Sequence, residues 1–383
     1  MGGCSSPAIS VRVCPSSFAG LTGFLGTHRD HPQKTLITVI SKLQGFQLNQ
    51  HWRTPLKIAL VGKGGSGKTT LAALLVRHLV AAGCPVLAVD ADINQHLAVA
   101  LGATEADSAA LPTLSSQLAL IKDYLRGINP RIASAAVMVK TTPPGAGSRL
   151  LRIVEPNPIY DACVREIGGV RLAVTGPLDG GDVGVACYHS KVGAVELLLN
   201  HLVDDVEEYV VVDMTAGADS FASGLFTRFD VMFLVCEPTL RSVGVYRQYC
   251  AYARDFGVRI AVVGNKVSDE EDAAFLCGQL GADLVGWVSR SAHVRAAERG
   301  EIRSIGELEP ANTATLDAMR AVVDSATKDW GTYQHQAVEF HLRNAAAWAN
   351  ARTGCDLADQ IDPDFVHGPD ALAWSGRLPS STH

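Results

Sequence analysis

Residues 62–70 read Gly62-Lys63-Gly64-Gly65-Ser66-Gly67-Lys68-Thr69-Thr70. The stretch matches the pattern G-x-x-x-x-G-K-[ST], which is typical of loops that wrap around phosphate groups. Glycines let the backbone approach an anion closely, and the N–H groups of such a loop point inward. The pattern predicts that Lys68 contacts the β- and γ-phosphates of a nucleotide and that Thr69 contacts Mg²⁺. The candidate nucleotide-binding residues of the loop are Gly62, Gly64, Gly65, Ser66, Gly67, Lys68, Thr69 and Thr70.

Short apolar runs recur on both sides of this loop. Because the runs are almost continuously apolar, they are typical of strands buried on both faces of a parallel sheet. Helical patterns such as 68–82 separate them. We therefore expect an α/β fold with a doubly wound, mostly parallel sheet of about seven or eight strands. The predicted strands are 57–61, 85–89, 171–175, 209–213, 231–236, 258–263 and 283–288.

The composition excludes several classes of protein. Of the 383 residues, 47% are hydrophobic and 19% are charged, so the chain can bury a large core and is not generally disordered. A net charge of −6 argues against a whole-surface nucleic-acid binder. No run of 18 apolar residues exists, and the nine cysteines include no C-x-x-C pair. We expect a cytoplasmic protein with reduced thiols and with neither nucleic acid nor membrane as a partner.

Carboxylates follow two of the predicted strands, where ligands of open α/β sheets bind. Asp90 and Asp92 come directly after the run 85–89, and Asp213 ends the run 209–213. A carboxylate at this edge can position or deprotonate an attacking water, or help to hold Mg²⁺. Asp213 has the arrangement expected of a residue close to the metal. Asp90 alone could instead cap the following helix.

Two more residues follow predicted strands. Gly217 closes the pattern D-x-x-x-G that begins at Asp213, and its N–H is a candidate sensor of the γ-phosphate. Asn265 follows the run 258–263, and an amide side chain offers adenine a donor and an acceptor together. A plain turn asparagine is the alternative for Asn265. Residues 265–268 lack the N-K-x-D guanine motif, which favours ATP over GTP.

Lys63 distinguishes this loop from other phosphate-binding loops. The sequence K-G-G-x-G-K-[ST] resembles the deviant P-loop of the ParA/MinD/nitrogenase-iron-protein group of dimeric ATPases. The resemblance implies a P-loop NTPase fold and ATP hydrolysis with conformational switching in a homodimer that forms on ATP binding. It implies that Lys63 reaches across the dimer to the partner's phosphates and that Asp92 activates water. It also implies that Asp90 lies near Mg²⁺ without touching it.

Three stretches, 212–219, 236–242 and 263–267, narrow the resemblance. Together they look like CooC-type ATPases, which help to mature the nickel site of carbon monoxide dehydrogenase. The resemblance covers about residues 56–325 and is poorest over 103–170. CooC-like proteins carry a Cys-x-Cys that binds one metal across the dimer, and Cys187-Tyr188-His189 stands at that position here.

The change from Cys-x-Cys to Cys187-x-His189 leaves two interpretations. One Cys and one His from each of two chains would give a four-ligand set suited to Zn²⁺, and less well to Ni²⁺ or Cu⁺. Alternatively, the spacing arises by chance and Cys187 is an ordinary buried cysteine. The departure from the pattern puts the nickel role in doubt and leaves the ATPase role untouched.

The sequence divides into three parts. Residues 1–55 are basic and poor in acids, which fits a poorly ordered extension, a transit peptide, a loose myristoylation pattern or a start codon placed too early. Residues 56–330 contain the P-loop ATPase domain. Residues 331–383 are expected to form a docking helix over 333–350 and a solvated acidic tail. Within the insertion 103–170, residues 141–147 are rich in Pro and Gly and are expected to form a mobile loop.

Three functions compete for such a chain. The first is a dimeric, Mg²⁺-dependent ATPase that drives a client or regulatory protein, including maturation of a metal centre. The second is a ParA/MinD-like positioning ATPase, which would need a basic patch or a basic amphipathic helix. The third is a small-molecule kinase or ligase on the same fold, for which the sequence offers no acceptor-site motif.

Overall fold

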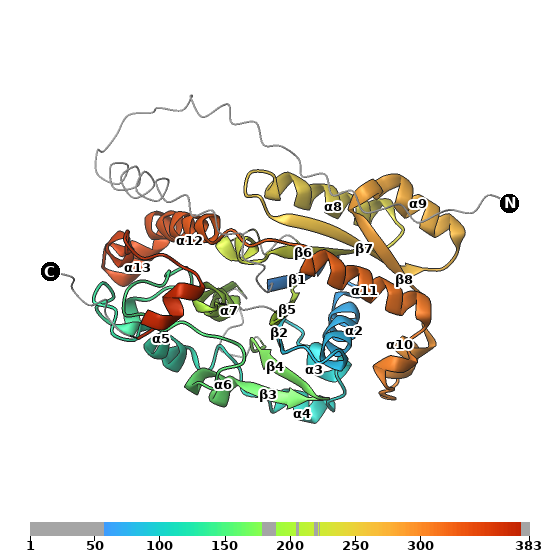
Figure 1. The fold of residues 1–383 in the computed structure, drawn as a ribbon, viewed down its shortest axis with the longest axis horizontal. Helices are drawn as coiled ribbons and strands as arrows, with labels where there is room; N and C mark the ends of the chain where they lie inside the picture. The colour runs from blue at the N-terminus through green and yellow to red at the C-terminus, as the bar shows by residue number, and fades with distance from the viewer. Residues whose placement is uncertain (1–56, 178–188, 204–206, 218–220, 222, 377–383) are drawn as a thin grey trace, which may run out of the picture.

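The apolar runs form one sheet in the computed structural model, which describes residues 57–177, 189–203, 207–217, 221 and 223–376 (Figure 1). In this part of the chain the sheet has eight strands in the order β3-β4-β2-β5-β1-β6-β7-β8. All neighbours are parallel except β3 and β4. The strands are β1 Lys57–Gly62, β2 Val86–Ala91, β3 Val164–Ile167, β4 Val170–Val174, β5 Tyr209–Met214, β6 Val231–Cys236, β7 Arg259–Val267 and β8 Leu284–Ser289. The expected mostly parallel α/β sheet is confirmed.

The strand β3 is the one element of the sheet that the apolar runs do not predict. It is only four residues long, pairs antiparallel with β4 at the sheet edge and leaves Arg165 and Glu166 exposed. An edge strand with one open side needs no continuous apolar run, because half of its side chains meet solvent. The pattern used for the buried strands therefore misses it.

Helices cover both faces of the sheet, as expected of a doubly wound fold. One core layer joins the sheet to α2, α3 and α11, and the other joins it to α5–α9 and to Phe340 of α12. No helix among the described residues is long and apolar enough to span a membrane. The helices are α2 Lys68–Ala81, α3 Leu97–Ala100, α4 Glu105–Ala109, α5 Leu118–Arg126, α6 Pro158–Cys163, α7 His189–His201, α8 Leu240–Ala253, α9 Glu270–Leu280, α10 Ala292–Ala297, α11 Pro310–Asp324, α12 Trp330–Asn344 and α13 Asn350–Thr353.

The strand register brings the acidic residues together. Asp213 of β5 pairs in register with Asp90 of β2 on one side and with Leu60 of β1 on the other. β1 then ends at Gly62 and the loop leads directly into α2. Because parallel strands end at the same edge of a sheet, the glycine-rich loop and both aspartates converge there.

The C-terminal segment and the insertion pack against each other, and this corrects two expectations. Residues 141–147 are not an open loop, since Thr141 and Thr142 are buried. Thr142 Oγ1 donates to Gln360 Oε1 at 3.1 Å, and the Ala146 N–H donates to Asp362 Oδ2 at 2.9 Å. The segment after α13 is not a wholly solvated tail either, because Leu357, Gln360 and His367 are buried, while its acidic residues other than Asp362 stay exposed. Residues 1–55 lie outside the described residues.

Candidate nucleotide-binding site

The phosphate-binding loop has the backbone that its glycines predict. Gly65 and Gly67 have φ of 78° and 95°, a region that L side chains rarely adopt. A Cβ on Gly62 would lie 2.7 Å from the carbonyl oxygen of Val235, so β6 leaves no room for a side chain there. The Ser66 N–H donates to the Lys63 carbonyl at 3.2 Å and closes the turn. The loop therefore presents its backbone to a ligand at the start of α2, where the positive end of the helix favours anions.

Lys68 and Asp213 face each other at the base of the loop. Burial lowers the pKa of Lys68, and the nearby charges of Asp213 and Asp92 oppose that shift. Burial raises the pKa of Asp213 well above its usual range, and the neighbouring Asp90 raises it further. The Thr69 hydroxyl and Lys68 act against this rise, yet neither Asp213 oxygen has a hydrogen-bond partner of normal geometry in the described chain. The site holds more negative charge than Lys68 alone can balance.

Asp90 shapes the segment that follows β2. Its Oδ1 accepts from the Asp92 N–H at 3.1 Å and its Oδ2 accepts from the Leu97 N–H at 2.9 Å, at the start of α3. Burial raises the pKa of Asp90 to about 7, although both N–H groups favour the charged form. Asp90 thus makes a contact like that of a helix cap, which was the alternative role given for it in the sequence analysis. The two bonds also hold the segment 90–97 at the edge of the sheet.

Asp92 lies on the same segment and lines the cavity. Its Oδ1 accepts from the backbone N–H and the side-chain amide of Asn94, at 2.9 and 3.0 Å. These bonds fix the orientation of a carboxylate that is 8% exposed. A fixed carboxylate beside the phosphate loop has the placement that activation of a water would require.

The donor set fits a hard divalent cation. Mg²⁺ prefers carboxylate, hydroxyl and phosphate oxygens and neutralises clustered negative charge. Both oxygens of Asp213 are buried without a hydrogen-bond partner among the described residues, and the Thr69 hydroxyl lowers the Asp213 pKa from close by. An orphaned buried carboxylate is costly unless a cation or a proton compensates it. Asp213 and Thr69 are therefore suited to hold Mg²⁺ with a nucleotide.

A cavity of about 610 Å³ opens beside the loop. That volume is within the usual range for small-molecule sites. Besides the loop and Asp92, its lining includes Asn265 and several residues of the segment 288–298, which runs from the end of β8 to just past α10. Arg290 and Arg295 of this segment were not predicted from the sequence. The rule used for the other strands would have found Arg290, because it directly follows β8.

Gly217 and Asn265 both contact the first strand or the loop. The Gly217 N–H donates to the Gly62 carbonyl at 3.2 Å. The Asn265 amide nitrogen donates to the Ser66 carbonyl at 2.7 Å and would lie 2.1 Å from a Cβ on Gly67. Asn265 therefore supports the loop in this structure, and this bond leaves its Oδ1 and its second amide hydrogen unused.

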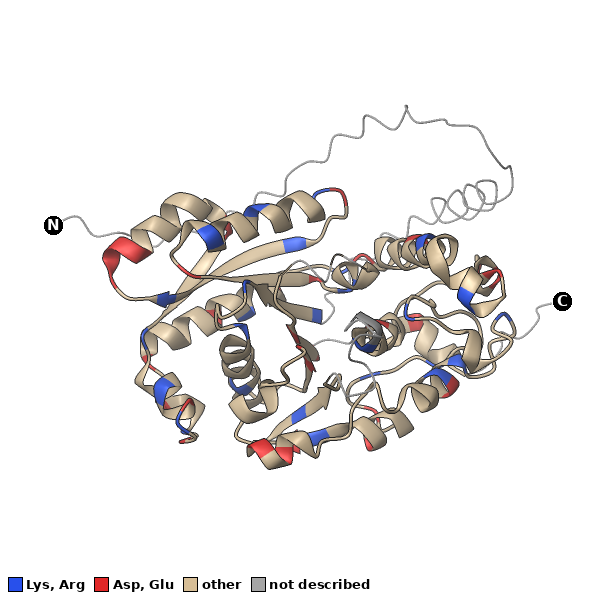
Figure 2. Cartoon of the chain, turned by 180° about the vertical axis from the view of Figure 1, so that it is seen from behind, with Lys and Arg blue, Asp and Glu red and all other residues tan. Residues whose placement is uncertain are grey.

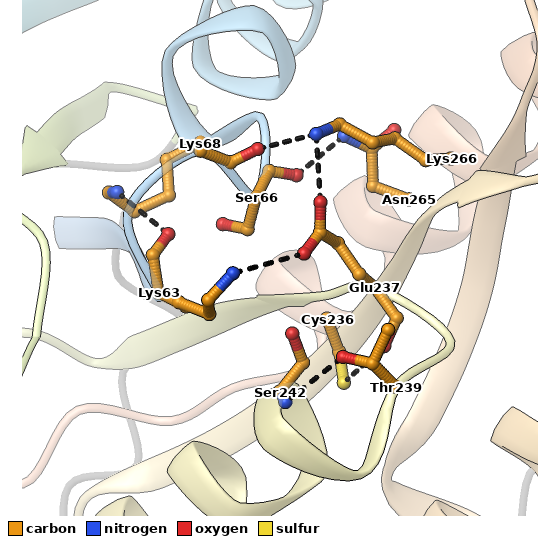
Figure 3. Close-up of polar contacts among 10 residues, drawn as sticks. Lys63, Ser66, Lys68, Cys236, Glu237, Thr239, Ser242, Asn265 and Lys266 are labelled. Carbon is orange, nitrogen blue, oxygen red and sulfur yellow. Dashed lines mark hydrogen bonds and ion pairs between the residues drawn. The ribbon is translucent and has the colours of Figure 1, made fainter.

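Lys63 points to an acidic residue that the sequence analysis did not single out (Figure 3). Lys63 Nζ lies 3.6 Å from Glu237 Oε2, and Lys266 Nζ donates to Glu237 Oε1 at 2.8 Å. Glu237 directly follows β6, so the carboxyl-end rule would have found it too. The proposed metal ligands Cys187 and His189 are different, since Cys187 lies outside the described residues and the His189 side chain is not described. Among the described residues no cluster of three or more His, Cys, Asp or Glu could hold a metal ion.

Two relatives are similar in sequence to this chain over most of their own length. The carbon monoxide dehydrogenase accessory protein CooC of Rhodospirillum rubrum is 28% identical over 270 residues, which is 70% of this chain and 96% of the relative. An uncharacterised ATP-binding protein of Methanocaldococcus jannaschii is 29% identical over 248 residues, covering 63% of this chain and 88% of the relative.

Solved structures with a similar fold are more distant in sequence. The cell division ATPase MinD of Pyrococcus furiosus is 19% identical, with a TM-score of 0.46 over 70% of this chain and 98% of that chain. A ParA family ATPase of Chlorobium tepidum is 16% identical, with a TM-score of 0.49 over 70% of this chain and 99% of that chain. The model of the CobQ/CobB/MinD/ParA nucleotide binding domain matches residues 58–303. The chain therefore belongs to this family of nucleotide-binding proteins and is an ATP-binding ATPase.

Proposed function

We propose that this ATPase is a Mg²⁺-dependent switch that closes into a homodimer when ATP binds. The observation that carries the proposal is the placement of Lys63. Residues 64, 65 and 67–70 line the chain's own cavity, whereas Lys63 is absent from that lining and its side chain is one-third exposed. Because Lys63 does not line the cavity of its own chain, its ammonium can serve the phosphates of a second chain.

The chemistry follows from the residues around the cavity. The loop N–H groups and Lys68 bind the phosphates of ATP, and Lys63 of the second chain adds a positive charge where negative charge develops during phosphoryl transfer. Asp92 orients the attacking water and accepts its proton. Thr69 and Asp213 would hold Mg²⁺, with Asp90 supporting the segment beside them, and the ion would neutralise phosphate charge. Gly217 would sense the γ-phosphate, and Asn265 would contact the base through Oδ1 and its second amide hydrogen.

The client of this switch is proposed to be a metalloenzyme. The support is the similarity to a protein named as an accessory of carbon monoxide dehydrogenase. Cys187 and His189 are the proposed ligands of a Zn²⁺ or Ni²⁺ ion shared by two chains. Elemental mass spectrometry of the purified dimer tests this part alone: about one metal per dimer, lost in Cys187→Ala/His189→Ala, is expected. A metal-free dimer that still hydrolyses ATP would refute the metal role and leave the switch intact.

A positioning ATPase of the ParA/MinD type is the alternative. Such a protein would use the ATP-bound dimer on DNA or a membrane through a basic surface. Figure 2 shows acidic and basic residues interspersed along the described elements, and α4 and α9 begin with acidic turns. The described surface thus offers no support for this role, which ranks it second.

The switch is tested by the mass of the protein in solution, measured with and without Mg·ATP by light scattering. The wild-type chain is expected to double its mass with ATP and to hydrolyse it. Lys63→Ala is expected to bind ATP with normal affinity and to lose hydrolysis by about 10³-fold or more, since a trans-acting cation is typically worth about 10³–10⁵-fold. Lys122→Ala, a lysine of α5, is the matched control. Normal turnover in Lys63→Ala would refute the cross-dimer role.

A further inference from the structure

Glu237 lies between the phosphate-binding loop and strand β7. Its side chain is only 16% exposed and forms ion pairs with Lys63 at 3.6 Å and with Lys266 at 2.8 Å. Lys63 belongs to the loop itself. Lys266 is attached to the loop through its Nζ, which donates to the Gly65 carbonyl at 2.6 Å. One carboxylate therefore holds the loop from two sides (Figure 3).

The local chemistry keeps this carboxylate charged. Partial burial acts to raise the pKa of Glu237, but the hydrogen bond and charge of Lys266, together with Lys63, outweigh it and leave the pKa below its usual range. Backbone geometry also fixes the arrangement, because Lys266 has a φ of 60° that turns it toward the loop. Glu237 is thus an anion within reach of Lys63 in the single chain, before any nucleotide or second chain is present.

We infer that Glu237 is a positioning residue that retains Lys63 against its own chain and gives it up when a second chain supplies phosphates. The inference rests on the proposed cross-dimer role of Lys63. A lysine that pairs with Glu237 must leave that pair to reach another anion, so the strength of the pair sets how readily the dimer closes. Phosphates carry more negative charge than one carboxylate, and therefore ATP can win this competition.

The contact itself is tested without nucleotide. An amine-reactive reagent is applied to the wild-type protein and to Glu237→Gln, and the labelling rate of the peptide that contains Lys63 is measured by mass spectrometry. Because exposed ion pairs are weak, removal of the carboxylate is expected to speed Lys63 labelling by about two- to fivefold. Glu339→Gln, which removes the partner of Arg343 on α12, is the matched control and should leave the rate unchanged. An unchanged rate in Glu237→Gln would overturn the inference.

The consequence for the switch is tested by titrating ATP and following dimer formation. Glu237→Gln is expected to dimerise at about two- to fivefold lower ATP concentration than the wild type, because the ion pair between Glu237 and Lys63 no longer has to be broken. The shift should vanish when both proteins also carry Lys63→Ala, a result that a merely structural role of Glu237 would not produce. A shift that persists in the Lys63→Ala background, or a shift to higher ATP concentration, would overturn the inference.

The two proposals fail in different ways. If the wild type forms no dimer with ATP, the proposed function fails, whereas the labelling experiment still measures the Glu237–Lys63 contact. If the dimer forms normally and Glu237→Gln changes neither labelling nor the ATP concentration required, the switch stands and the role of Glu237 is refuted.

Discussion

The backbone N–H of Gly217 donates a hydrogen bond of 3.2 Å to the carbonyl of Gly62. Gly62 ends β1 and begins the phosphate-binding loop, and Gly217 closes the segment that follows Asp213 at the end of β5. The Gly217 carbonyl in turn accepts from the hydroxyl of Tyr249, a buried residue of α8. Both backbone groups of Gly217 are thus occupied within the chain. Its N–H must leave Gly62 before it can meet a phosphate.

Replacing Tyr249 by phenylalanine tests whether this segment is held from α8. The change removes the donor to Gly217 while it keeps the buried ring, so the free energy of unfolding should fall by about 1 kcal/mol. We expect faster hydrogen exchange at the Gly217 amide in the nucleotide-free protein, measured by mass spectrometry. Tyr252→Phe alters an exposed tyrosine of the same helix and should leave that exchange unchanged. Equal exchange rates in both variants would mean that α8 does not hold the segment.

Lys68→Ala is expected to abolish detectable hydrolysis and to weaken nucleotide binding. The charges of Asp213 and Asp92 act on the ammonium of Lys68, which is the lysine of the loop that lines the cavity. Loss of one charge-stabilising group typically reduces turnover by about 10²–10³-fold. Phosphate release and binding of a fluorescent ATP analogue measure the two effects. Lys122→Ala controls for loss of a lysine. Hydrolysis at the wild-type rate would show that Lys68 does not contact the transferred phosphate.

The paired aspartates predict how stability depends on pH. The pKa of Asp90 is about 7 in the folded protein against 3.8 as its ordinary value, so the folded state holds a proton that the unfolded state has released between these limits. Stability must therefore fall as the pH rises through this range. Without nucleotide and Mg²⁺, we expect the free energy of unfolding to drop by about 2 kcal/mol between pH 5.5 and pH 8. Urea unfolding in the presence of EDTA measures it.

Asp213→Asn should flatten this dependence. Burial raises the pKa of Asp213 well above its usual range and the Asp90 charge raises it further, so this carboxylate takes part in the titration, whereas the amide that replaces it does not titrate and can donate to Asp90. At pH 8 the metal-free variant is expected to be more stable than the wild type and to lose its hydrolytic activity. Asp123→Asn changes an exposed aspartate and should retain the wild-type slope. A variant with the same slope as the wild type would show that the two carboxylates do not share the titration.

The sequence predicts the site where chemistry and topology coincide. A strand buried on both faces can be recognised from its apolar run, and a polar residue at its carboxyl end then lies at the ligand edge. Asp90, Asp213 and Asn265 were found in this way, and all three lie near the loop in the structure. Their individual contacts were not predictable. That Asn265 supports the Ser66 carbonyl depends on how closely β7 approaches the loop, which no local pattern encodes.

The missed features have a common physical cause. Glu237 and Lys266 flank the loop, but their importance depends on contacts with Lys63 and Gly65, which are far from them in the sequence. The burial of residues 141–147 likewise depends on hydrogen bonds to residues after 356. A stretch rich in Pro and Gly predicts the absence of regular structure. Whether such a stretch is buried depends on which other segment of the chain packs over it.

Removal of residues 330–383 should destabilise the whole protein. The division at residue 330 remains a prediction from composition, and the structure favours one cooperative unit. Phe340 of α12 packs edge-on against Phe226, with ring centroids 5.5 Å apart. Two buried cations, Lys57 and Arg228, bond to the hydroxyl and the carbonyl of Tyr333. The truncation would expose this core and remove one hydrogen-bond partner from each cation, at a cost of about 1.5–3 kcal/mol for each bond to a charged group.

Together with the lost packing of Phe340, about 3–5 kcal/mol, this cost is comparable to the stability of a typical domain, about 5–15 kcal/mol, so the shortened chain is expected to unfold near room temperature or to aggregate. Differential scanning fluorimetry of both forms measures the difference. Asp370→Asn, which changes an exposed residue of the same segment, is the control and should leave the melting temperature unchanged. Phe340→Ala separates packing from charge: it should destabilise by about 3–5 kcal/mol and leave Lys57 and Arg228 paired. A truncated chain that melts like the full-length protein would establish residues 330–383 as a separate attachment.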